Sequence, residues 1–153
     1  MKGIVIFDTS YGNTRKIAET ISAVLKGSGI EVDFFYVKDV KKLSAGDYDF
    51  LVIGSPTKFG TMSFTIKGFL GKFKSAEWAN KRFAAFGTEN PENIERKEGS
   101  AAEKIAARLK ECRMKQLLPV FKGVALGWKG PLQEGEIERA SEYARKLATE
   151  LQK

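Results

Sequence analysis

The sequence contains no histidine among its 153 residues. Mechanisms that need an imidazole, such as Ser-His-Asp hydrolysis, histidine-ligated zinc and histidine proton relays, are therefore excluded. The single cysteine, Cys112, excludes an internal disulfide, a thiolate metal cluster and a C-x-x-C redox pair. Because a reducing compartment permits such cysteine usage, we expect a cytoplasmic protein, in which Cys112 is a core residue on a helix.

Long hydrophobic runs are also missing. The apolar run from Gly3 to Phe7 ends at Asp8, far short of a signal segment or a membrane span. We therefore expect no membrane contact and interpret this run as a buried strand. With 42% hydrophobic and 29% charged residues, the composition is that of a globular chain rather than a disordered one. The length predicts a single domain over residues 1–153.

Short apolar runs alternate with longer segments of helical period, a pattern that predicts an α/β fold with a parallel sheet between two layers of helices. The predicted strands are residues 3–7, 31–37, 50–54, 83–86 and a fifth within 117–126. Pro119 and Gly123 interrupt the fifth. The predicted helix stripes are Ile17, Ile21, Val24 and Leu25; Ile66, Phe69, Leu70 and Phe73; Ile105, Leu109 and Cys112; and Ile137, Ala144, Leu147 and Leu151.

The loop after the first predicted strand is rich in small polar residues. It reads Thr9, Ser10, Tyr11, Gly12, Asn13 and Thr14. Ligands of such sheets bind outside the carboxyl ends of the strands, and the free N–H groups of a helix start attract anions. The loop therefore suits a phosphate, while a simple N-cap and turn is the alternative interpretation. The sequence has neither the G-x-x-x-x-G-K-[ST] nor the G-x-G-x-x-G pattern, so the common nucleotide loops are unsupported.

Three segments resemble the flavin loops of the flavodoxins. Residues 9–14 are similar to the family's T/S-x-T/Y-G-N-T phosphate loop, residues 54–60 to its second loop, and residues 86–90 occupy the place of its third. The resemblance implies a flavodoxin-like three-layer α/β/α sandwich whose five-stranded parallel sheet has the order 2-1-3-4-5. It also implies FMN as the cofactor, with the phosphate in the first loop and the isoalloxazine ring between the other two.

The resemblance implies a set of cofactor-binding residues from these loops. They are Thr9, Ser10, Tyr11, Gly12, Asn13, Thr14, Ser55, Pro56, Thr57, Lys58, Phe59, Gly60, Gly87, Thr88, Glu89 and Asn90. A flat ring needs apolar contacts on its faces and backbone donors at its polar edge, which Pro56, Phe59 and a turn at Gly87 can supply. A core position for Phe59 is the alternative. We predict no catalytic residue and no metal site.

Two features depart from the flavodoxin pattern. Residues 88–91 of the third loop contain no aromatic, so that one ring face is either open or covered from elsewhere, for example by Trp128, for which core packing is the alternative. The net charge of +7 is unusual for a family of acidic proteins. It predicts acidic redox partners such as a ferredoxin or a reductase. Nucleic acid is not expected, because no stripe of stacking aromatics accompanies the charge.

Three functions are compatible with this sequence. The first is an FMN-binding carrier that shuttles electrons between redox partner proteins, with the cofactor supplying the chemistry. The second is an FMN-dependent oxidoreductase that acts on a quinone or a similar small molecule at an open ring face. The third is an interaction module without flavin, which the intact hydroxyl loop disfavours. The carrier is the function that we expect.

Overall fold

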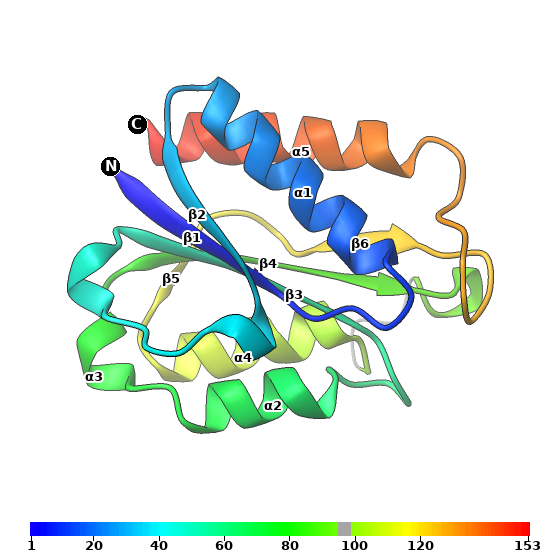
Figure 1. The fold of residues 1–153 in the computed structure, drawn as a ribbon, viewed down its shortest axis with the longest axis horizontal. Helices are drawn as coiled ribbons and strands as arrows, with labels where there is room; N and C mark the ends of the chain where they lie inside the picture. Colours follow the sequence, from blue (N-terminus) through cyan, green and yellow to red (C-terminus); the bar gives the residue numbers. More distant parts are fainter. Residues whose placement is uncertain (95–98) are drawn as a thin grey trace.

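A parallel sheet forms the middle layer of the computed structural model, which describes residues 1–94 and 99–153 (Figure 1). Its strand order is β2-β1-β3-β4-β5, and β6 pairs with β4 beyond β5. The strands are β1 (Lys2–Phe7), β2 (Glu31–Tyr36), β3 (Phe50–Pro56), β4 (Arg82–Glu89), β5 (Lys115–Gln116) and β6 (Phe121–Val124). The predicted fold class and the order 2-1-3-4-5 are confirmed.

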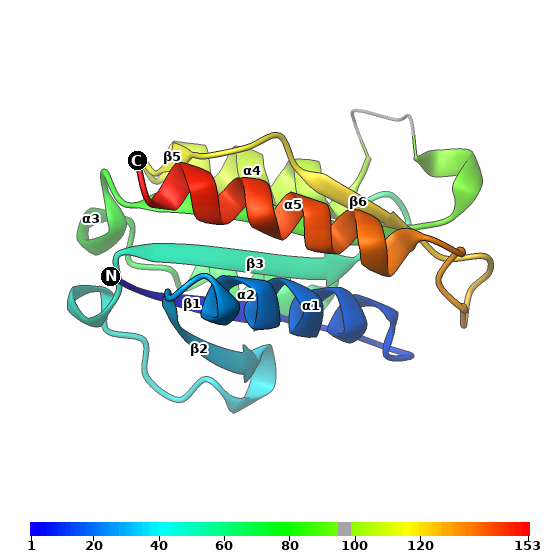
Figure 2. The same cartoon turned by 90° about the horizontal axis from the view of Figure 1, so that it is seen from above.

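Helices cover both faces of the sheet, as Figure 2 shows from above. On one face lie α1 (Asn13–Gly27) and α5 (Glu136–Leu151). On the other lie α2 (Phe64–Gly71), α3 (Ser75–Trp78) and α4 (Ala101–Glu111). Three short 3₁₀ turns complete the described chain: η1 (Val37–Asp39), η2 (Ala45–Asp47) and η3 (Pro91–Asn93). None of the helices in residues 1–94 and 99–153 is long and apolar enough to cross a membrane.

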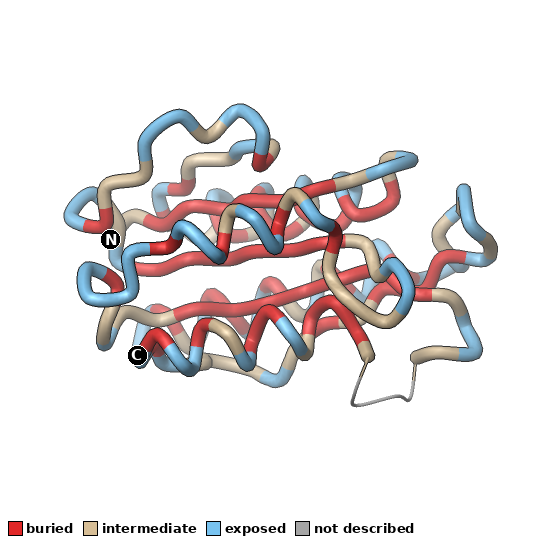
Figure 3. Tube along the Cα trace, turned by 90° about the horizontal axis from the view of Figure 1, so that it is seen from below, coloured by how far each residue is buried: buried red, intermediate tan, exposed pale blue. Residues whose placement is uncertain are grey.

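The central strands are buried on both sides (Figure 3). Successive strand residues point to opposite faces, so each strand contributes to two cores. In β1, Val5 packs in the core beneath α1 and α5, whereas Ile4 and Ile6 pack in the core beneath α2 and α4. This two-sided burial explains why the strands are continuous apolar runs instead of alternating ones.

The fifth strand position is divided between two short strands. Lys115 and Gln116 pair with β4 first, and Phe121 then pairs with Phe86. Between these pairs β4 advances from Phe83 to Phe86 while its partner advances from Gln116 to Phe121, so the partner has two extra residues. Pro119 lies in this inserted segment, where the missing N–H does not interrupt the pairing. The expectation of one strand within 117–126 is therefore corrected to β5 and β6.

Other predicted boundaries also need correction. Strands β3 and β4 continue to Pro56 and Glu89, past the predicted ends at residues 54 and 86, because their backbone pairing extends to the pair Pro56 and Thr88. Most residues of the predicted helix stripes are buried. Val24 and Phe69 are half-buried, Ile137 is exposed, and Phe73 follows α2. Cys112 is buried directly after α4, as expected. The Ser100 hydroxyl accepts from the Glu103 N–H and caps α4.

The Tyr143 hydroxyl on α5 is buried and has no hydrogen-bond partner among the described residues. Its ring packs against Phe121, with centroids 5.3 Å apart. Tyr143→Phe should raise the free energy of unfolding by about 1 kcal/mol, because the variant keeps the ring contact and removes an unsatisfied group. Urea denaturation measures the change. As a control, Tyr48→Phe should lower stability, because the Tyr48 hydroxyl donates to Asp33 at 2.6 Å. An unchanged or lower stability of Tyr143→Phe would contradict the prediction.

Candidate functional site

Four loops meet at the carboxyl end of the sheet, at the end opposite the two termini (Figure 1). They follow β1, β3, β4 and β6 and enclose a cavity of about 70 Å³, the inner cavity. Its lining is Thr9, Ser10, Tyr11, Asn13, Thr14, Pro56, Thr57, Lys58, Thr88, Glu89, Asn90, Ala125, Gly127 and Trp128. An outer hollow of about 450 Å³ adjoins it and is lined by Ser10, Tyr11, Thr57, Lys58, Phe59, Asn90 and Trp128.

The first loop leaves the start of α1 without a side-chain cap. Gly12 occupies the N-cap position with a left-handed φ of 91°, a conformation that glycine adopts at low cost. The Thr9 hydroxyl accepts from the Gly12 N–H at 2.9 Å and so tightens the loop one residue before the helix. Because no side chain caps the first turn, its N–H groups and the positive end of the helix dipole are available to an anion.

Two buried threonines connect the first and third loops. The Oγ1 atoms of Thr14 and Thr88 lie 2.9 Å apart and share one hydrogen bond. Thr14 is 1% exposed and Thr88 4% exposed, yet both line the inner cavity. Since a hydroxyl can donate one hydrogen bond and accept others, each retains capacity toward a ligand. This pair fixes the start of α1 against the end of β4.

The second loop contains a tight turn. Lys58 and Thr61 exchange both backbone hydrogen bonds, at 2.8 and 3.0 Å. The two residues between them have positive φ, 51° at Phe59 and 76° at Gly60. A left-handed backbone is uncommon for an aromatic residue. The Phe59 side chain is fully exposed at the outer hollow, so the alternative core position for Phe59 is wrong.

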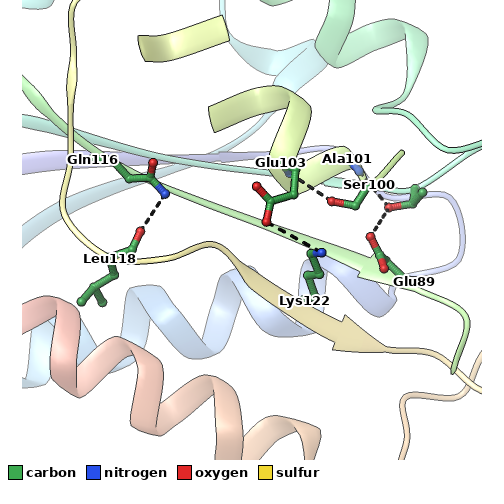
Figure 4. A network of polar contacts seen from close by, with 8 residues as sticks. Glu89, Ser100, Ala101, Glu103, Gln116, Leu118 and Lys122 are labelled. Atoms are coloured by element: carbon green, nitrogen blue, oxygen red, sulfur yellow. Dashed lines mark hydrogen bonds and ion pairs between the residues drawn. The ribbon is translucent and has the colours of Figure 1, made fainter. Parts of the chain in front are cut away.

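The Glu89 carboxyl at the end of β4 is buried and lines the inner cavity. Figure 4 draws it as part of a network of polar contacts. Thr57 donates to one of its oxygens at 3.4 Å, and the other oxygen has no partner among the described residues. Burial raises the pKa of Glu89, and the Lys122 ammonium and the Ser100 and Thr57 hydroxyls offset part of that rise. A buried acid with an unused oxygen can therefore meet a ligand group in this cavity.

Comparison with known proteins identifies the family. A flavodoxin-domain family model matches residues 4–126. The chain belongs to the flavodoxin family. The flavodoxin of Aquifex aeolicus is 35% identical over 78 residues, which are 50% of this chain and 42% of that protein. Protoporphyrinogen IX dehydrogenase [quinone] of Escherichia coli K12 is 32% identical over 72 residues, 47% of this chain and 40% of that enzyme. The matches thus span less than half of either relative's length.

Solved structures agree with the fold of this flavodoxin-family chain. A flavodoxin from the domain Archaea superimposes with a TM-score of 0.83 at 22% identity and covers 100% of both chains. Family membership implies FMN as the cofactor, as the sequence predicted. The site fits such a group, because an uncapped helix start suits a phosphate and exposed aromatics beside it suit a flat ring.

The structure brings most of the sequence-predicted residues together. All but four line the inner cavity or the outer hollow. The four that do not are Gly12, Ser55, Gly60 and Gly87. Gly12 and Gly60 shape their loops through positive φ, while the buried Ser55 hydroxyl accepts from the Ser63 N–H at 2.9 Å.

The expected turn at Gly87 is wrong, because Gly87 lies inside β4. A Cβ at this position would approach the Ser55 carbonyl oxygen at 2.9 Å, so the glycine permits close strand pairing. The loop after β6 contributes Ala125 and Gly127, which the sequence analysis missed, because the interrupted fifth strand hid where that loop begins. Trp128 is 81% exposed at the site, so the alternative that it packs in the core is wrong.

Glu89→Gln should stabilise the ligand-free protein near neutral pH. The pKa of Glu89 is higher in the folded protein than in the unfolded chain, so folding favours the protonated acid. The stability that this preference contributes is present below the unfolded pKa and is lost as the pH rises through the folded pKa. A glutamine side chain does not titrate, so the stability advantage of Glu89→Gln over wild type should grow as the pH rises above about 4. Urea midpoints across this range measure the difference.

The matched control for this comparison is Glu142→Gln, which changes an exposed carboxylate on α5. Its stability difference from wild type should stay small at every pH. A gap between Glu89→Gln and wild type that does not change with pH would show that the charge of Glu89 is not the cause.

Proposed function

We propose that this flavodoxin-family chain is an FMN-binding carrier that shuttles single electrons between partner proteins. Two adjoining compartments support this proposal. The inner cavity is polar and lies at an uncapped helix start, whereas the outer hollow is aromatic and open to solvent. FMN has a matching division between its phosphate and its ring. When bound, FMN supplies the redox chemistry, and the protein supplies binding, orientation and electrostatics.

The first loop holds the phosphate in this proposal. Ser10 and Thr14 supply hydroxyl donors, and the first turn of α1 supplies N–H groups. Lys58 and Glu89 are the only charged side chains among the described residues that line the inner cavity. The phosphate is therefore held mainly by neutral donors and the helix dipole, with Lys58 at the rim.

The second and third loops hold the ring. Phe59 in the second-loop turn lines the outer hollow, and Asn90 lines both this hollow and the inner cavity. The remaining residues of the predicted set support these contacts from behind: Thr14 and Thr88 bond each other, and Ser55 holds the start of α2 through Ser63. A ring held by Phe59 and Asn90 at this hollow would supply one-electron chemistry to a docked protein without a substrate pocket.

The partner in this proposal presents an acidic surface. Lys58 is exposed and lines the outer hollow, and the exposed Lys129 places its ammonium 5.9 Å from the centre of the ring of Tyr11, which also lines the hollow. Exposed cations around an electron-transfer site attract acidic partners over distances of about 10 Å at moderate salt. An acidic ferredoxin or a reductase with an acidic docking face has the required charge.

A second candidate function is oxidoreduction of a quinone. The resemblance to the E. coli quinone-linked dehydrogenase and the open outer hollow favour it. It requires that a small molecule reach the flavin and turn over. If the reduced protein gives rapid steady-state turnover with a water-soluble quinone and none with an acidic ferredoxin, the oxidoreductase is the better description.

Ser10→Ala should weaken FMN binding by about 1 to 3 kcal/mol, because it removes a hydroxyl donor to a charged phosphate. Riboflavin, which lacks the phosphate, should bind the wild type far more weakly than FMN does. Its affinity for Ser10→Ala should equal its affinity for the wild type. Isothermal titration of the ligand-free protein measures both. The control Thr20→Ala removes an exposed hydroxyl on α1 outside the site and should leave both affinities unchanged. Equal wild-type affinities for riboflavin and FMN would disprove the phosphate assignment.

Lys58→Gln and Lys129→Gln should each slow electron transfer to an acidic [2Fe–2S] ferredoxin severalfold at low salt. The loss of one cation weakens the electrostatic attraction of the acidic ferredoxin. Because salt screens the same attraction, the difference in rate between variant and wild type should vanish at high salt. Stopped-flow mixing at several salt concentrations measures the rates. Lys26→Gln changes an exposed lysine at the far end of α1 and serves as the control. Equal effects of all three variants would point to net charge rather than to a docking face at the rim.

A further inference from the structure

Two exposed aromatic side chains lie at the outer hollow. Phe59 is 104% exposed and Trp128 81% exposed, and both line this hollow. Burial of large apolar side chains stabilises a folded protein, yet these two side chains are exposed to water beside one cavity. Such an arrangement marks a surface that a ligand covers. The two residues come from different loops, after β3 and after β6, so they can approach a flat ligand from two sides.

The loop that contains Trp128 is firmly held. The Ala125 N–H donates to the Glu89 carbonyl at 2.8 Å, and the Leu126 N–H donates to the Pro131 carbonyl at 2.8 Å. These bonds fix the start of the loop to the end of β4 and to the segment at Pro131 where the loop returns. Trp128 is therefore exposed on an ordered support rather than on a free loop.

The same loop is docked on the start of α1. The Asn13 side-chain amide donates to the Lys129 carbonyl at 3.3 Å. At Gly130, where φ is +94°, a Cβ atom would lie 2.5 Å from the Asn13 amide nitrogen, so only glycine permits this close approach. Trp128 thus has a set position relative to the proposed phosphate site, the condition for contact with a ligand anchored there.

Residues 88–91 of the third loop supply no aromatic side chain to the outer hollow. After Asn90 the chain turns into η3. Of the described residues between β4 and α4, Asn90 alone lines the outer hollow. Trp128, whose loop is bonded to Glu89 at the end of β4, also lines the hollow.

We propose that the Trp128 indole stacks on one face of the bound isoalloxazine ring, on the side away from the turn at Phe59 and Gly60. The inference rests on the proposed binding of FMN. Offset stacking of two flat ring systems adds to the burial of their area, and the ordered loop reduces the entropic cost of the contact. The loop after β6 would then supply the aromatic cover that the third loop lacks.

The first test compares FMN dissociation constants of four proteins. Trp128→Ala should weaken binding at least about tenfold, whereas Trp128→Phe should stay within a few-fold of wild type. Phe64→Ala is the matched control, because Phe64 is 90% exposed at the start of α2 yet lines neither the inner cavity nor the outer hollow. If Trp128→Ala binds FMN as Phe64→Ala does, the stacking proposal is wrong.

The second test is the fluorescence of bound flavin, which an indole in contact quenches by electron donation and a phenyl ring does not. Trp128→Phe should therefore bind FMN normally but fluoresce several times more strongly than wild type. Tyr11→Phe is the comparison, because Tyr11 also lines the hollow. Recovery of emission in Tyr11→Phe but not in Trp128→Phe would assign the stacking to Tyr11 and overturn the proposal. A wild type that binds no FMN would instead refute the proposed function.

Discussion

Two phenylalanine rings lie over glycines of the neighbouring strand, and the site depends on the register that they hold. Gly3 pairs with Phe50, and Gly54 pairs with Phe86. A Cβ at either glycine would lie about 2 Å from the opposing ring, at 2.1 and 2.2 Å. Shifting β3 by one residue would place a side chain beneath each ring and move apolar residues to the wrong core. In the observed register β1 ends at its pair with Gly54, and β3 and β4 continue side by side to the pair Pro56 and Thr88, so the three loops meet at one cavity.

The sequence allowed the fold and much of the site to be predicted, because hydrophobic periodicity and the first loop are local signals. The ends of β3 and β4 were misplaced for a physical reason. Ser55, Pro56 and Gly87 are residues typical of turns, yet in this sheet they continue the strands. Ser55 bonds Ser63, and Gly87 permits the strands to approach closely, so tertiary contacts outweigh local preference.

The contribution of the last loop was harder to predict. Two extra residues divide the fifth strand, and periodicity alone does not show where pairing resumes or where the following loop begins. Asn13 then docks that loop on α1, a contact between residues more than a hundred positions apart. The burial of Glu89 is equally nonlocal, because it results from packing against Thr57 and the start of α4. Sequence patterns contain little information about such contacts.

The charges at this site are arranged by depth. Deep in the cavity lie hydroxyls, helix N–H groups and Glu89, whose raised pKa reflects the cost of a buried carboxylate. The cations Lys58 and Lys129 are exposed at the rim. A phosphate that is bound by neutral donors needs no contact with these two lysines. In the proposed function, the lysines therefore remain available to an acidic partner. These cations then have two effects in that function: they favour the added negative charge of the reduced ring, and they attract an acidic partner. The proposal thereby joins the +7 net charge of the chain to the same cofactor that the family binds.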